Sequence, residues 1–101
     1  MLEAVLRGLT SLDGVRTVLF VEDDGFVVHA HPMPHGIEAS VIETWKALAK
    51  QAAPDALTTL VMEEGYLMLK PVETRVLMTV CARACNLGKV RRALESIQWP
   101  T

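Results

Sequence analysis

Acidic residues and imidazoles crowd into one short stretch, VEDDGFVVHAHPMPH, which runs from Val21 to His35. Carboxylates and imidazoles bind zinc and other divalent ions, so this stretch is the first candidate for chemistry. His29 and His31 are two residues apart and would share one side of a strand, with His35 beyond a Pro-Met-Pro bend. A closed zinc site needs four ligands, however, and no fourth ligand is fixed by the spacing. We favour a β-hairpin with polar side chains on an edge strand, and keep a metal-binding or small-ligand sensor as the alternative.

The cysteines and the remaining acids give no catalytic pattern. Cys81 and Cys85 are four apart, which is not a Cys-x-x-Cys motif, and buried packing thiols are the expected interpretation, although a helix dipole near Cys85 would make it more acidic. The glycines are dispersed, and no phosphate-binding loop or nucleophile–base pair is present. The sequence therefore predicts no enzyme activity and no cofactor.

Composition narrows the class of protein further. The chain has 101 residues, half of them apolar, and a net charge of −2, which fits one domain over residues 1–101 with an aliphatic core. There is no run of like charges and no apolar segment of membrane-spanning length, so neither nucleic-acid binding nor membrane insertion is expected. The basic set Lys89, Arg91 and Arg92 could form a patch for an acidic partner or a phosphate, but it is more typical of a solvated helix face. With no signal-peptide core at the start and only two cysteines, a cytoplasmic location is expected.

Hydrophobic periodicity and turn residues predict the elements that carry these side chains. Apolar residues at three- and four-residue spacing indicate a first helix over residues 2–12, a long one over 36–53 and a last one that begins at the Asn86 cap. Alternating or β-rich runs predict strands over 17–22, 26–31, 57–63, 66–71 and 75–82. The order is α-β-β-α-β-β-β-α, an α+β class.

Two hairpin turns are expected, at Asp24-Gly25 and around Glu64-Gly65, because glycine allows the positive φ that tight hairpins need. A two-residue loop at Asp24-Gly25 pairs Asp23 with Phe26, which sets His29 opposite Phe20 and His31 opposite Val18.

The middle helix carries more apolar surface than one sheet requires. Its apolar residues, among them Val41, Trp45 and Leu48, fill an arc of roughly 160°, whereas a helix on a sheet needs a little over about 100°. The surplus predicts a second packing partner. Ala47 and other small residues on its remaining surface would let another protein approach closely.

The motifs at both ends resemble those of the Roadblock (dynein light chain) domain family, including its bacterial MglB-like GTPase regulators. The resemblance covers essentially the whole chain and is carried by Leu12-Asp13-Gly14-Val15, Asp24-Gly25, Leu69-Lys70-Pro71 and Asn86-Leu87-Gly88-Lys89-Val90-Arg91. It implies a five-stranded antiparallel sheet of order 2-1-5-4-3, with the middle helix on one face and the first and last helices on the other. It also implies a homodimer made by the middle helix and the third strand.

By the same resemblance, the expected function is that of a non-catalytic homodimeric regulator or scaffold that binds a small Ras-like GTPase. The expected dimer interface comprises Val41, Trp45, Leu48, Leu60 and Met62. The expected partner-binding surface comprises Ser40, Glu43, Lys46, Ala47 and Lys50. On this view, reversing the charges of Lys46 and Lys50 should weaken partner binding and leave the melting temperature nearly unchanged. Three questions stay open at this stage. The protein could be an activator or a scaffold, and it could form a homodimer or pair with a related subunit. The sensor built on His29, His31 and His35 also remains an alternative.

Overall fold

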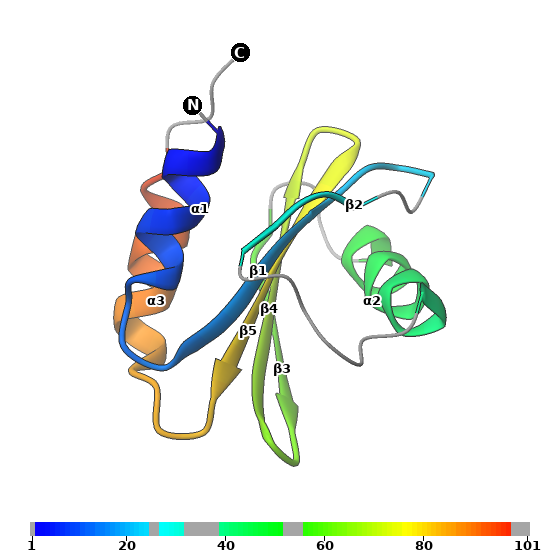
Figure 1. The fold of residues 1–101 in the computed structure, drawn as a ribbon. Coiled ribbons are helices and arrows are strands. Elements are labelled where there is room, and N and C mark those ends of the chain that lie inside the picture. The colour runs from blue at the N-terminus through cyan, green and yellow to red at the C-terminus, as the bar shows by residue number, and fades with distance from the viewer. Residues whose placement is uncertain (1, 25–26, 32–38, 52–55, 98–101) are drawn as a thin grey trace.

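The computed structural model describes residues 2–24, 27–31, 39–51 and 56–97. Three helices and five strands follow one another in the order α1-β1-β2-α2-β3-β4-β5-α3 (Figure 1). Their bounds are α1 Leu2–Thr10, β1 Val15–Val21, β2 Val27–His31, α2 Ala39–Gln51, β3 Thr58–Met62, β4 Gly65–Val72, β5 Arg75–Ala82 and α3 Leu87–Glu95. Within these ranges, no helix is long and apolar enough to cross a membrane.

The strands form one antiparallel sheet in the order β2-β1-β5-β4-β3. Helices α1 and α3 lie side by side on one face, and α2 lies on the opposite face (Figure 1). Strand β3 therefore forms one edge of the sheet, hydrogen-bonded to β4 alone among the described strands.

Alternation along the central strands gives the molecule two apolar layers. In β1, Val18 and Phe20 point toward α1 and α3, whereas Leu19 and Val21 point toward α2, and all four are buried. A strand covered on both faces must be apolar on both faces, which is why β1 has an uninterrupted hydrophobic run rather than an alternating one. Buried aliphatic side chains of this kind contribute about 1.5–3 kcal/mol each, so these two layers hold the helices on the sheet.

The structure tests the two predicted hairpins unequally, because Gly25 and Phe26 lie outside the described residues. His29 lies opposite Phe20 and His31 opposite Val18, as the two-residue loop requires, but Val21 then pairs with Val27 across a β-bulge. The bulge shifts the register by one residue between Phe20 and Val21. Asp23 and Asp24 lie in a turn, whereas Gly25 and Phe26, on which the predicted loop and the pairing of Asp23 with Phe26 depend, are outside the described residues.

The second hairpin turns one residue earlier than predicted. Met62 pairs with Gly65, so the loop is Glu63-Glu64 and the glycine is the first residue of β4. A Cβ atom on Gly65 would lie 2.0 Å from the Cys81 carbonyl oxygen. Glycine is needed there for close approach of two strands and not for a turn conformation.

The bounds of the helices agree more closely with the predicted bounds than the turns do. The structure describes α2 over Ala39–Gln51, and the predicted ends at residues 36–38 and 52–53 lie outside the described residues. The predicted cap of the last helix is confirmed, because the Asn86 side chain accepts a hydrogen bond from the Lys89 backbone N–H at 3.1 Å. This bond satisfies one of the backbone donors that every helix leaves free at its start.

Candidate interaction surface

Helix α2 presents an apolar flank toward the β3 edge of the sheet. Trp45 and Leu48 are half-buried against the core on this face, and Val41, on the same side of the helix, is 36% exposed. Leu60 and Met62 of β3 are also half-buried and pack against the same cluster. The structure thus brings all five residues of the expected dimer interface to one side of the molecule, with part of each side chain left open to solvent.

The exposed edge strand beside this flank is unusually apolar. Strand β3 reads TTLVM and has no charged residue. Its fourth residue, Val61, is 80% exposed and points to the face opposite Leu60 and Met62. Monomeric proteins normally protect an open edge with lysine, proline or a bulge, because its free N–H and C=O groups can pair with another strand. This edge has none of these features within the five residues of β3, and it is therefore suited to pairing with a second chain.

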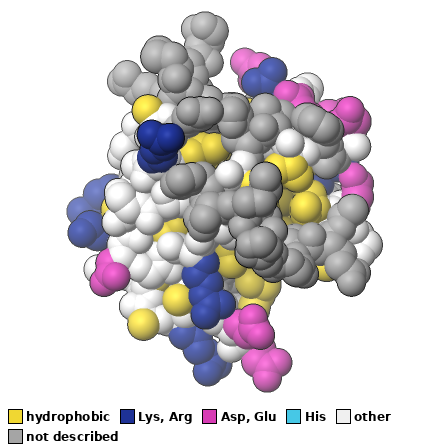
Figure 2. Space-filling view, in the orientation of Figure 1, with side chains coloured by type: hydrophobic (Ala, Val, Ile, Leu, Met, Phe, Trp, Pro, Cys, Tyr) yellow, Lys and Arg dark blue, Asp and Glu magenta, His cyan; other side chains and the backbone are white. Residues whose placement is uncertain are grey.

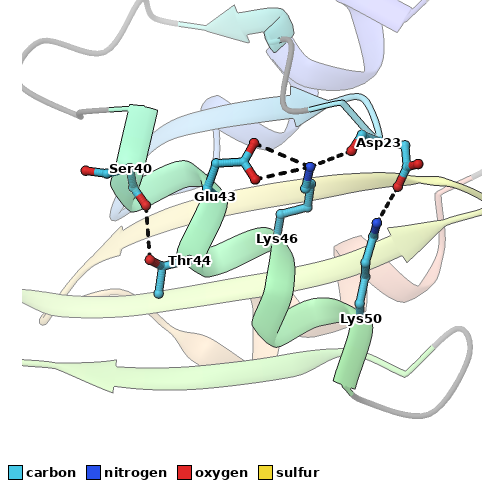
Figure 3. Close-up of polar contacts among 6 residues, drawn as sticks. All are labelled: Asp23, Ser40, Glu43, Thr44, Lys46 and Lys50. Atoms are coloured by element: carbon cyan, nitrogen blue, oxygen red, sulfur yellow. Dashed lines mark hydrogen bonds and ion pairs between the residues drawn. The ribbon is translucent and has the colours of Figure 1, made fainter.

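The opposite flank of α2 is polar and is attached to the turn between β1 and β2. The Lys46 ammonium donates to the backbone carbonyl of Asp23, and the Lys50 ammonium donates to the Asp23 carboxylate (Figure 3). A third contact, 3.4 Å long, joins the Lys46 ammonium to the Glu43 carboxylate one turn earlier on the helix. Two lysines of one helix therefore hold a single turn residue.

Lys46 and Lys50 differ sharply in their surroundings. Lys46 is only 8% exposed, whereas the side chains of Lys50 and Asp23 are 51% and 60% exposed. The sequence placed Lys46 among the exposed charges of a partner surface, but in the structure its ammonium is directed to the protein's own backbone. A lysine stem readily crosses apolar surface to reach a polar group, which explains the burial.

The Lys50 contact lowers the pKa of the Asp23 carboxyl below its ordinary value. The hydrogen bond from Lys50 is the largest cause, and the charge of Lys50 adds to it, with a smaller contribution from Lys46. Asp23 is therefore ionised throughout the neutral range and keeps the turn attached to α2 by charge as well as by the backbone hydrogen bond.

Between the two flanks, α2 presents a ridge of small and short side chains. Ser40, Thr44 and Ala47 are all exposed, and the Thr44 hydroxyl donates to the Ser40 carbonyl at 3.0 Å (Figure 3). Glu43 and Lys50 border this ridge on its polar side, with Glu43 54% exposed. Of the five residues expected to bind a partner, four are accessible in the folded chain and Lys46 is not.

The candidate metal ligands are only partly described. Strand β2 contains His29 and His31, and His35 lies outside the described residues. Among the described residues, no group of three or more His, Cys, Asp or Glu side chains could hold a metal ion.

The basic residues of α3 are exposed, and the Arg91 Nε donates to the Glu95 carboxylate at 3.0 Å, as on an ordinary solvated helix. Acidic and basic side chains are interspersed over the visible face of the described part of the molecule (Figure 2).

Sequence reasoning missed two residues of this surface. Val61 lies in an uncharged edge strand, a signal that could have been found once β3 was recognised as an edge. The role of Asp23 as the attachment point of Lys46 and Lys50 could not have been found, because the contacts span 23 and 27 residues of sequence.

Comparison with known proteins gives matches at the level of structure. No protein-family model matches the chain, and no curated protein matches it. A Roadblock/LC7 domain from Streptomyces avermitilis superposes with a TM-score of 0.74 at 19% identity, covering 94% of this chain and 92% of that one. Myxococcus xanthus MglB gives 0.72 at 20% identity, covering 91% and 84%. The gliding protein MglB of Thermus thermophilus gives 0.69 at 21% identity, covering 92% and 79%. The resemblance inferred from the sequence motifs is thus confirmed in three dimensions: the chain has the fold of Roadblock/LC7 domains.

Proposed function

We propose that the chain is a non-catalytic homodimeric regulator or scaffold that binds a small Ras-like GTPase. The observation that carries this proposal is the uncharged β3 edge beside the half-buried apolar flank of α2. Antiparallel pairing of two β3 edges would satisfy their free backbone groups, and it would bring the Val41, Trp45 and Leu48 flanks of two α2 helices together. The match to Roadblock/LC7 structures supports the same arrangement.

The GTPase would bind the ridge and polar flank of α2, which remain outside that dimer seam. Ser40 and Ala47 allow close approach of a partner backbone, while Glu43 and Lys50 supply charges for orientation and association rate. Lys46 would act indirectly, by holding the Asp23 turn beside this surface. Such a protein acts by holding the switch segments of its partner, so it needs no nucleophile or phosphate loop of its own. A cytoplasmic location fits this role.

The dimer part of the proposal is tested by a charge placed in the seam. Trp45→Glu should give monomers or aggregates, because burying a carboxylate between two apolar flanks costs at least several kcal/mol. Gln51→Glu is the matched control, since it adds the same charge at an exposed position of the same helix. Sedimentation velocity measures the oligomeric state of both variants and of the wild type. A stable Trp45→Glu dimer would remove α2 from the interface.

The GTPase part is tested with the Ras-like GTPase encoded nearest to this gene in the source genome. We expect the purified chain to bind that GTPase with a preference for one nucleotide state, and to hydrolyse no GTP by itself. Titration calorimetry and phosphate release measure these two properties. GTP hydrolysis by the pure chain would contradict the proposal if a single substitution abolished it. A failure to bind the GTPase in either nucleotide state would also contradict the proposal.

A further inference from the structure

The two cysteines meet at one corner of the fold, where β5 ends and α1 passes into β1. Cys81 lies opposite Val15 in the β1–β5 pairing. The next residue, Ala82, donates its backbone N–H to the Gly14 carbonyl at 2.8 Å and accepts the backbone N–H of Cys85 at 3.2 Å. The chain therefore turns back directly after Cys81, and this turn returns Cys85 to the strand pair that contains Cys81.

Gly14 fixes Cys85 at this corner. A Cβ atom on Gly14 would lie 2.3 Å from the Cys85 Cβ and 2.6 Å from its Cα, and Gly14 has a φ of +91°. Any side chain at position 14 would displace Cys85, so glycine is required both by its conformation and by the contact. Because Gly14 immediately precedes the partner of Cys81, it holds Cys85 beside that pair.

The two thiols differ in access to solvent. Cys81 is 2% exposed and belongs to the core layer under α1 and α3, whereas Cys85 packs against the same layer from its margin and is half-buried. Cys85 also immediately precedes Asn86, the N-cap of α3. Cys85 is therefore more accessible than Cys81 to a small reagent from solvent.

The thiols also interact with each other electrostatically. The pKa of Cys81 is raised to about 12, mainly by burial, with additional contributions from the charge of Cys85 and from a hydrogen bond between the two side chains. Cys81 is consequently protonated at neutral pH and a weak nucleophile, because the thiolate is the reactive form of cysteine.

We propose that Cys81 and Cys85 form a redox-active dithiol that a hydroperoxide converts to an intrachain disulfide. The Cys85 thiolate attacks the peroxide oxygen, the O–O bond breaks, and Cys85 becomes a sulfenic acid as the peroxide's other oxygen leaves as water or an alcohol. The Cys81 sulfur then attacks the Cys85 sulfur, the S–O bond breaks, and water leaves with the thiol proton. Both sulfurs are oxidised by one electron each, and the peroxide takes up the two electrons.

The first step prepares the second. The sulfenic acid formed at Cys85 carries no charge. The repulsion that a Cys85 thiolate exerts on ionisation of Cys81 is therefore removed, together with the hydrogen bond between the two thiols. Burial then remains as the main obstacle to forming the Cys81 thiolate. The product joins the end of β5 to the residue before the α3 cap, so oxidation would fix α3 covalently to the sheet.

Hydrogen peroxide treatment of the full chain tests this proposal. After removal of excess peroxide, the protein is unfolded in the presence of iodoacetamide and its mass is determined intact and by peptide mapping. The wild type should lose two hydrogen atoms, present no alkylatable thiol, and recover both thiols with dithiothreitol. Cys81→Ser should form a sulfenic acid at Cys85 that dimedone traps. Cys85→Ser should leave Cys81 alkylatable, with oxidation slowed roughly tenfold or more.

Three results would overturn the proposal. The first is irreversible oxidation of Cys85 in the wild type with Cys81 still alkylatable. The second is a disulfide between chains instead of within one chain, or no reaction at all. The third is oxidation of Cys81 in Cys85→Ser at the wild-type rate, which would mean that solvent reaches Cys81 directly.

Discussion

Lys46 and Lys50 offer a matched pair of perturbations on one helix. Both ammonium groups bind Asp23, but Lys46 is 8% exposed and reaches the backbone, whereas the Lys50 side chain is 51% exposed and reaches the carboxylate. Substituting each by methionine removes the charge and keeps the aliphatic stem. The difference between Lys46→Met and Lys50→Met therefore compares a buried charged hydrogen bond to a backbone carbonyl with an exposed ion pair.

The two substitutions should differ severalfold in cost. A hydrogen bond that involves a charged group contributes about 1.5–3 kcal/mol, and Lys46→Met loses one such bond to the Asp23 carbonyl in a partly buried setting. An exposed ion pair contributes about 0–1 kcal/mol, which bounds the loss in Lys50→Met. Lys46→Glu should be worse, at about 3–5 kcal/mol, because it buries a carboxylate without a partner next to a carbonyl oxygen and Glu43.

Urea unfolding at one fixed protein concentration measures these differences, with an unchanged slope showing that only stability has changed. The reasoning is refuted if Lys46→Met and Lys50→Met lower the free energy of unfolding equally, within about 0.5 kcal/mol. The same numbers correct the sequence-based expectation that reversing both lysines would leave the melting temperature unchanged. Lys50 alone is suitable for a surface test.

Two further predictions concern stability. Thr79 is fully buried at the centre of β5 and its hydroxyl has no hydrogen-bond partner among the residues that the structure describes, so Thr79→Val should raise the free energy of unfolding by about 1–3 kcal/mol in urea titrations. Because the folded pKa of Asp23 lies below its ordinary value of 3.8, its contribution to stability is present above that value and is lost as the pH falls through the lowered one. The stability difference between wild type and Asp23→Asn should accordingly vanish in acid, whereas a constant difference down to the lowest pH would show that Lys50 does not act through the charge.

Local patterns predicted the parts of the fold that depend on neighbouring residues. Asn86 as a helix cap and His29 opposite Phe20 follow from side-chain chemistry and the two-residue strand repeat, and the structure has both. The second turn was misplaced because the close approach of Gly65 to the Cys81 carbonyl depends on packing between strands that are distant in sequence. Periodicity cannot detect such contacts.

The residues of the candidate surface also fall into those that the sequence could place and those that it could not. Val41, Trp45 and Leu48 could be read from the surplus apolar arc of the helix, because helical spacing alone puts them on one side. Lys46 could not be placed, since the sequence gives a charge on a helix but not the position of the Asp23 turn that it reaches. Long side chains that bind distant backbone atoms lie beyond any pattern read along one chain.

The central claim is that the exposed ridge of α2 binds the GTPase, and titration of that GTPase with two charge variants tests it most directly. Ala47→Glu places a carboxylate on the ridge, and Arg92→Glu places one on the exposed face of α3, on the opposite side of the sheet. We predict that Ala47→Glu raises the Kd at least about tenfold, or roughly 1.4 kcal/mol, with the dimer intact, and that Arg92→Glu leaves it within about twofold. Weakened binding by Arg92→Glu with full affinity in Ala47→Glu would contradict the account and move the surface to α3.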